Sequence, residues 1–190
     1  MIGLSENLAL YHGSYTTVST IDLAKCSDGL DFGRGFYVTS SKQQAISYVP
    51  SSVRKAKRRG VIPESFDEAD GQVSHYRFLP SGSLNIRCFA DADTEWLHFA
   101  ACNRSKTLFP ELREKYAAMD IIAGKVADDV TAVTLNNYVA GAYGEPGTEQ
   151  ADRIAIALLE PERLTDQFCF RTENAILALM FMGSDRYGDL

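Results

Sequence analysis

Two short segments of this sequence gather the residue types that could do chemistry. The first is Tyr11-His12-Gly13-Ser14, at the end of an expected strand. The second is Phe32-Gly33-Arg34-Gly35-Phe36-Tyr37, followed by an expected helix that carries Tyr48. A histidine at a strand end can do acid–base or hydrogen-bonding chemistry, or it can be a structural residue. The Gly-x-Gly step can be a simple turn. It is not a Rossmann fingerprint, because it precedes a strand and lacks the third glycine.

The pattern around these segments predicts a mixture of short strands and helices. Strands are expected at 8–12, 36–39, 72–79, 84–89, 119–124 and 166–171. Helices are expected briefly at 20–26, from 42 until Pro50 ends or kinks it, and at 90–104, 129–142, 147–159 and 173–183. Ser40 or Ser41 is expected to cap the second helix, and Thr172 the last, which would end at Gly183. Without regular βαβ alternation, the order indicates one α+β domain over residues 1–190.

Length and composition exclude several classes of protein. The chain has 190 residues, of which 45% are hydrophobic and 23% charged, as in soluble globular proteins. We expect no membrane span, no secretory signal and a cytoplasmic location. Its 4 cysteines show no CxxC spacing, which favours free thiols, and its 3 histidines leave little for a metal centre, so no metal is expected.

The charge balance is acidic, with one local exception. The formal net charge is −6, which argues weakly against a protein that coats nucleic acid. Five cations nevertheless crowd into residues 54–59, namely Arg54, Lys55, Lys57, Arg58 and Arg59. Two interpretations stay open: a solvated helix end, or a contact for a phosphate or an acidic partner.

The order of the motifs resembles the NAD-binding half of the ADP-ribosyltransferase fold, in the polymerase branch named for a His-Tyr-Glu active site. The longer pattern resembles the bacterial DUF3990 family and spans about residues 8–182. The segments that carry this resemblance are LYHGSY, DFGRGFYVT, WLHFAACNR, DIIAGKVADD and QFCFRTENAILAL. The resemblance implies two small antiparallel sheets with flanking helices and an NAD cleft between them.

The resemblance also implies roles for the residues of the first two segments. His12 would bind the adenosine ribose, Gly13 would clamp the nicotinamide amide, and Ser14 would fix the loop or contact a ribose. Tyr37 and Tyr48 would stack on the nicotinamide ring. The structural alternatives are a core strand aromatic for Tyr37 and a packed helix residue for Tyr48.

Two further residues of the second segment join the expected NAD site. Phe36 is counted with the cofactor-binding residues. Arg34 lies where a cation could meet the pyrophosphate, or it is a solvated loop arginine. No metal is implied.

The third catalytic position departs from the resembled pattern. The family glutamate that would hold the ribose 2′-hydroxyl aligns with Gln167, which brings no negative charge. Glu173 is the other catalytic candidate, against its alternative as a first-turn acid that favours the helix dipole. Asp166 should point to the opposite face from Gln167.

Two other pairs are left with open interpretations. Asp128 and Asp129 could line the cleft, or Asp128 could cap the following helix. Asn103 and Arg104 end an expected helix, where they could be structural or could contact a phosphate or acceptor.

The expected function is NAD-dependent mono-ADP-ribosyl transfer to a macromolecular acceptor, protein or nucleic acid, by a bacterial toxin that a cognate antitoxin protein would neutralise. The alternatives are an NAD or ADP-ribose binding module without turnover and an NAD glycohydrolase. The interpretation requires His12, Tyr37 and Gln167 to converge on one cleft. It fails if His12 and Tyr37 lie on opposite sides of the sheet.

Overall fold

The computed structural model describes residues 3–80, 82–125, 129–160 and 164–190. Its strands are β1 (Ala9–Ser14), β2 (Phe36–Thr39), β3 (Gln72–Phe78), β4 (Ile86–Cys88), β5 (Ile121–Lys125), β6 (Asp166–Phe170) and β7 (Leu179–Arg186). Its α-helices are α1 (Lys42–Arg58), α2 (Thr94–Arg104), α3 (Pro110–Lys115), α4 (Asp129–Val139), α5 (Glu149–Leu159) and α6 (Glu173–Leu177). The mixed α+β class is confirmed.

The strands form one seven-stranded sheet in the order β4-β5-β6-β2-β1-β3-β7. The expectation of two small antiparallel sheets is therefore wrong: the described strands make one sheet, in which β4 and β5 run parallel. The reason is a single register pair between β1 and β2, Tyr11 opposite Thr39, which joins β1-β3-β7 to β4-β5-β6-β2. The two halves thus share one strand pair, while a common core cluster packs against both of them.

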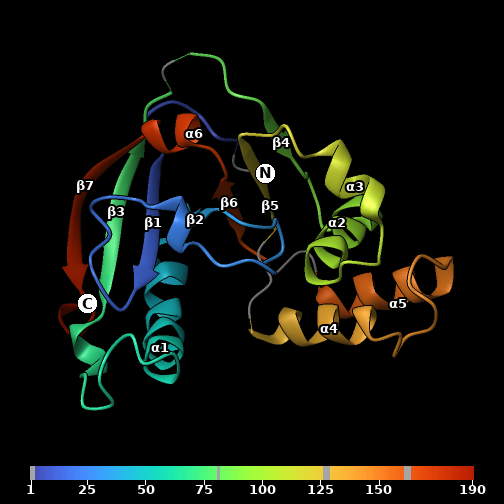
Figure 1. Ribbon diagram of the computed structural model, residues 1–190, viewed down its shortest axis with the longest axis horizontal. Coiled ribbons are helices and arrows are strands. Elements are labelled where there is room, and N and C mark those ends of the chain that lie inside the picture. Colours follow the sequence, from blue (N-terminus) through green and yellow to red (C-terminus); the bar gives the residue numbers. More distant parts are fainter. Residues whose placement is uncertain (1–2, 81, 126–128, 161–163) are drawn as a thin grey trace.

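Different helices cover the two halves of the sheet. Helix α1 lies beside β1 and β2, whereas α2 to α5 gather near β4 and β5 (Figure 1). The buried α1 residues Ala45, Val49 and Val53 pack with Val73 of β3. The opposite face of the sheet holds a second cluster that includes Leu10, Phe36 and Phe168.

Of the two predicted caps of α1, Ser40 and Ser41, the structure has Ser41. The Ser41 hydroxyl accepts a hydrogen bond from the Gln44 amide at 3.2 Å. Pro50 does not end the helix, which continues to Arg58. Apolar residues at helical spacing on both sides of the proline, Val49 and Val53, are fully buried against the sheet. This packing outweighs the backbone hydrogen bond that a proline cannot donate.

The predicted closing helix 173–183 is wrong over most of its length. The Thr172 cap is confirmed, but α6 ends at Leu177 and the chain enters β7. Strand β7 pairs antiparallel with β3 along that strand, so Gly183 lies opposite His75 in the sheet and caps no helix. A long antiparallel partner was available here, and tertiary pairing overrode the helical preference of the segment.

Candidate functional site

The candidate site lies where β1 and β2 separate: Tyr11 of β1 pairs with Thr39 of β2, and the following β1 residues do not pair with β2. We call this place the strand split. Thr39 is also opposite Gln167 of β6. Tyr11, Thr39 and Gln167 therefore form one row across the sheet. Directly opposite residues share a face, so Tyr11, Thr39 and Gln167 point to the side that carries α1.

His12 follows Tyr11 and bridges the strand split. Its Nδ1 donates a hydrogen bond to the carbonyl oxygen of Tyr37 at 2.7 Å, and its ring centroid is 4.6 Å from that of Phe36. Burial lowers the pKa of His12, and the hydrogen bond to Tyr37 opposes this only in part. The imidazole is therefore neutral at pH 7, which leaves Nε2 as an acceptor for a ligand hydroxyl.

Gly13 lies against the first turns of α1. A side-chain Cβ at this position would be 2.0 Å from the carbonyl oxygen of Ala45. Glycine is thus required here by the close approach of α1 to β1, whatever its relation to a ligand. Ser14, the last residue of β1, is buried as well.

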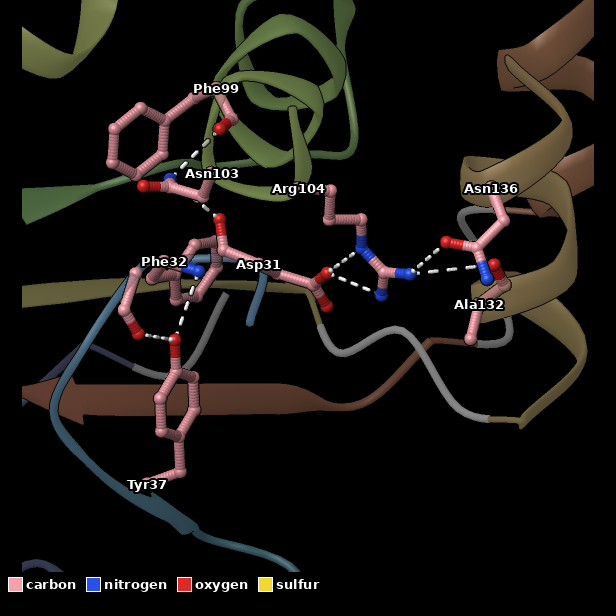
Figure 2. Close-up of polar contacts among 9 residues, drawn as sticks. Asp31, Phe32, Tyr37, Phe99, Asn103, Arg104, Ala132 and Asn136 are labelled. Atoms are coloured by element: carbon pink, nitrogen blue, oxygen red, sulfur yellow. Dashed lines mark hydrogen bonds and ion pairs between the residues drawn. The ribbon is translucent and has the colours of Figure 1, made fainter. Parts of the chain in front are cut away.

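Tyr37 holds the loop that precedes its own strand. Its hydroxyl donates to the carbonyl of Gly33 at 2.7 Å and accepts from the amide of Phe32 at 3.0 Å (Figure 2). Burial, followed by the nearby Cys169 thiol, raises the pKa of Tyr37 well above its ordinary value, so the phenol stays protonated. The Tyr37 ring packs against a core cluster, with its centroid 6.5 Å from that of Phe32. This packing fits the structural alternative, in which Tyr37 is a core aromatic of the strand.

Two side chains of α2, Asn103 and Arg104, also hold this loop. We call these two residues, together with Asp31 and Tyr37, the loop anchor. Arg104 forms an ion pair with Asp31 at 2.6 Å, and these side chains are 16% and 7% exposed (Figure 2). Arg104 also donates to Asn136 of α4 at 2.8 Å. The amide of Asn103 donates to the carbonyls of Asp31 and Phe99 at 3.0 and 2.9 Å. Of the two interpretations of Asn103 and Arg104, the structure thus favours the structural one.

Gln167 is buried at 8% exposure, and its amide nitrogen Nε2 has no hydrogen-bond partner among the described residues. Beside it, the Thr39 hydroxyl lies 2.6 Å from Gln44 Oε1 and 3.0 Å from the carbonyl of Asp166. Thr165 also donates to Gln44 Oε1, at 2.6 Å. A buried donor without an acceptor costs about 1–3 kcal/mol, and a ligand or a water could supply the acceptor. Among the described site residues that were predicted, only Gln167 has such an unpaired buried group.

The remaining residues assigned to cofactor binding lie in different settings. Phe36 is 5% exposed, in the core cluster on the face opposite α1. The Arg34 guanidinium donates to the carbonyls of Leu23 and Ala24, at 3.2 and 2.8 Å, and remains exposed. Tyr48 is 43% exposed on α1, so its alternative as a packed helix residue is wrong.

The acidic candidates are not gathered around Gln167. Glu173 is exposed at the start of α6, beyond the opposite end of β6 from Gln167. Asp166 points away from Gln167, as predicted, and lies 3.3 Å from Lys125 Nζ. Asp128 and the side chain of Asp129 lie outside the described residues.

The predicted convergence of His12, Tyr37 and Gln167 on one face is wrong. Tyr37 is opposite Cys169 and shares the face of Gln167 and Thr39, whereas His12 follows Tyr11 and points to the other face. His12 reaches Tyr37 only through the main-chain carbonyl of that residue. At the strand split, Gly13 and the Gln167 amide therefore lie on the face that carries α1, whereas the His12 ring lies on the opposite face beside Phe36. The Tyr37 side chain is directed into the loop anchor, so the interpretation in which His12 and Tyr37 hold NAD together fails its own condition.

The sequence analysis missed a second polar network, which joins three helices. His98 Nε2 of α2 lies 2.8 Å from Asp152 Oδ2 of α5, and the Tyr138 hydroxyl of α4 donates to Asp152 Oδ1. The Gly147 amide donates to the Tyr138 oxygen at 2.9 Å. A hollow of about 670 Å³ lies alongside it. The hollow is lined by Thr94, His98, Gly147, Glu149, Asp152, Arg153, Ile156 and Ala157.

A third missed cluster ties α1 to the edge of the sheet. Asp185 of β7 lies 2.7 Å from Lys42 Nζ and 3.0 Å from His75 Nε2. The His75 ring meets that of Tyr11 edge-on at 5.3 Å. Only the alternation of QVSHYRFL, which predicted β3, gave any sign of His75, because β7 was expected to be a helix.

Comparison with known proteins gives a family and no function. The family model described as "Protein of unknown function (DUF3990)" matches residues 8–181, so the chain belongs to the DUF3990 family, as predicted. No curated protein matches it. No solved structure matches it.

The described residues offer neither a metal site nor a membrane span. Within residues 3–80, 82–125, 129–160 and 164–190, no group of 3 or more His, Cys, Asp or Glu residues could hold a metal ion. In the same ranges, no helix has the length and apolar character to cross a membrane. All 4 cysteines are free, as predicted.

Proposed function

We propose that this protein binds NAD at the strand split and transfers its ADP-ribose to a macromolecular acceptor. The observation that carries the proposal is the buried Nε2 of Gln167, which has no partner among the described residues and lies in the same row as Tyr11 and Thr39, the one described pair that joins β1 to β2. The ordered motifs support the proposal by their resemblance to the ADP-ribosyltransferase superfamily. A toxin role, an antitoxin partner and a cytoplasmic location rest on that resemblance alone and stay predictions.

Without the Tyr37 side chain, three residues still offer chemistry that the reaction needs, with His12 and Gln167 on opposite faces of the sheet and Tyr48 on α1. The neutral His12 ring offers Nε2 as an acceptor for a ribose hydroxyl. The Gln167 amide offers a donor that can orient the 2′-hydroxyl of the nicotinamide ribose. Tyr48, on the helix that approaches Gly13, offers an exposed ring on which the cationic nicotinamide can stack.

In the proposed step, the bond between nicotinamide and ribose C1 breaks and its electron pair leaves with neutral nicotinamide. The acceptor nucleophile forms a bond to C1 and loses a proton. The intermediate state resembles an oxocarbenium ion, which a carboxylate would stabilise. Gln167 can orient the ribose but supplies no charge, so we expect a slow enzyme that adds single units and builds no chains.

A binding module without turnover is the second candidate, and two observations favour it. Gln167 stands where the resembled family has a glutamate. The Tyr37 hydroxyl is already occupied by the amide of Phe32 and the carbonyl of Gly33. Both observations leave NAD binding in place and remove groups that could take part in the chemistry.

The decisive experiment measures nicotinamide release from NAD by the purified protein, in buffer and then in bacterial lysate. Release in lysate that His12→Ala abolishes supports the transferase, and release in buffer supports the glycohydrolase. His98→Ala is the matched control, because it makes the same substitution at a histidine of α2, away from the strand split. No release, together with a rise in Tm when NAD is added, supports the binding module. Absence of both release and thermal shift refutes NAD binding.

A second pair of variants separates the roles of Gln167. In a working enzyme, Gln167→Ala lowers the rate of release and leaves NAD affinity mostly intact. In an idle binding module, Gln167→Glu restores the missing charge and creates activity. If Gln167→Ala changes neither rate nor affinity, Gln167 has no part in the site.

A further inference from the structure

The basic run on α1 remains without a role after the proposed site is accounted for. Its members are Arg54, Lys55, Lys57, Arg58 and Arg59. Among the residues that the structure describes, none of the five is part of an ion pair, whereas Lys42, earlier on the same helix, pairs with Asp185. In a protein of net charge −6, an unpaired group of five cations is a strong local exception.

Two of these cations share one side of the helix with Tyr48. Lys55 and Arg59 follow Tyr48 by seven and eleven residues, which returns each to within about 20° of the same direction. The Lys55 ammonium donates to the Tyr48 hydroxyl at 3.0 Å and lies 4.9 Å from the centre of its ring. We call Tyr48, Lys55 and Arg59 the cationic stripe.

The cationic stripe faces the loop that precedes β2. The Arg59 guanidinium donates to the Ser27 hydroxyl at 3.3 Å, across from α1 to that loop. At the other end of the helix, the carbonyl of Ala45 is the group that approaches Gly13. With a rise of about 1.5 Å per residue, Lys55 and Arg59 lie about 15–20 Å along the helix from the turn that approaches Gly13.

We infer that the cationic stripe binds the phosphodiester backbone of a nucleic acid, which is the acceptor of the proposed reaction. Phosphate contacts by lysine and arginine need no sequence-specific pocket, and a line of cations follows a repeating line of phosphates. The acceptor role rests on the proposed function, whereas the binding of the strand does not. Asp28 follows Ser27 in the chain, and it forms no ion pair among the described residues.

The chain offers a matched control for this inference. Lys57 and Arg58 lie on the same turn as the stripe but point to other sides of α1. The double variant Lys55→Glu/Arg59→Glu and the double variant Lys57→Glu/Arg58→Glu change the net charge equally. A cation-rich helix end that only favours the helix dipole predicts equal effects from both pairs.

The binding test uses fluorescence anisotropy with labelled single-stranded RNA and DNA of about 20 nucleotides, which is long enough to span one binding site. We expect the stripe variant to lose about tenfold or more in affinity and the control variant less than about threefold. Each phosphate contact adds about 0.7 to the slope of log K against log salt, so the stripe variant should lose about 1.4. Equal losses in both variants, an absence of binding, or displacement of the strand by polyglutamate at equal charge overturns the inference.

The acceptor test follows the label from NAD in bacterial lysate. Label that nuclease removes and protease does not, and that the stripe variant fails to transfer, supports a nucleic-acid acceptor. Label that only protease removes overturns the acceptor role and leaves the proposed function standing. Strand binding that depends on the stripe, with no nicotinamide release at all, refutes the proposed function and supports the binding surface.

Discussion

The strand split and the loop anchor lie at the two ends of the segment that contains Phe32 to Tyr37, and they differ in how fully their polar groups are paired. In the loop anchor, the carboxylate of Asp31, the guanidinium of Arg104 and the hydroxyl of Tyr37 all have partners. At the strand split, the Gln167 amide has none among the described residues, and β1 and β2 share one pair.

The difference separates two roles of one sequence motif. A satisfied buried network rigidifies its surroundings, so the loop anchor acts as a scaffold that fixes the loop before β2. An unsatisfied buried donor costs stability, and folded proteins retain such groups where a ligand or water completes them. The motif resemblance placed Tyr37 of the loop anchor among the NAD contacts together with His12 and Gln167, whereas the unpaired amide of Gln167 singles out the strand split.

Removal of Arg104 should have the largest effect, because it breaks the loop anchor. In Arg104→Met, the Asp31 carboxylate, whose side chain is 7% exposed, loses the cation that lies 2.6 Å away. We expect a loss of about 3 kcal/mol in the free energy of unfolding. Urea denaturation measures it, with Arg153→Met, at an exposed position of α5, as the control. A loss below about 1 kcal/mol would show that the loop anchor is not the scaffold proposed here.

Gly13→Ala tests the side of the strand split that α1 covers. The new Cβ would lie 2.0 Å from the Ala45 carbonyl oxygen, so α1 and β1 must move apart. Overpacking of this kind costs about 1–3 kcal/mol, and thermal denaturation should show a lower Tm. Gly3→Ala is the control, because a Cβ there meets nothing within 4 Å. An unchanged Tm would mean that the helix can shift without cost.

Gln167→Met should act in the opposite direction and stabilise the protein. It replaces a buried amide without a partner by an apolar side chain of similar length, so the free energy of unfolding should rise by about 1 kcal/mol. Nicotinamide release should slow in the same variant, with NAD affinity mostly intact. Gln44→Met is the control. It removes the acceptor of Thr165 and should destabilise the protein by about 1 kcal/mol. If Gln167→Met destabilises the protein as much, Gln167 is a structural residue.

Local chemistry made much of the fold predictable from the sequence. Strand β2 was predicted with its bounds, 36–39, because the segment is β-branched and aromatic. The caps at Ser41 and Thr172 follow from hydroxyls placed before helical segments, and each accepts from the amide three residues later. Asp93 caps α2 in the same way.

The failures concern information that lies far away in the chain. Strand β7 forms because β3 offers an antiparallel partner more than a hundred residues earlier, and no local pattern in ALMFMG states this. The face of a side chain depends on register, and the single pair between Tyr11 and Thr39 sets His12 against Tyr37. Motif order specified which residues belong together but not which side of the sheet each one faces.

The smallest effect belongs to the ion pair between Lys42 and Asp185, which fixes α1 to β7. The Lys42 ammonium holds the pKa of Asp185 below its ordinary value. A lowered folded-state pKa stabilises the protein above the unfolded-state value of about 4, and this contribution is lost as the pH falls through the folded-state value. Because the pair is 40% and 36% exposed, it contributes only about 0.3–0.5 kcal/mol. Lys42→Met should therefore lower the free energy of unfolding by that amount at pH 7 and by less at about pH 3. Urea denaturation at both pH values measures the difference, with Lys57→Met as the control. A difference that persists in full at the lower pH would mean that Lys42 stabilises α1 by packing of its alkyl chain, since a charge interaction with Asp185 cannot survive protonation of the carboxylate.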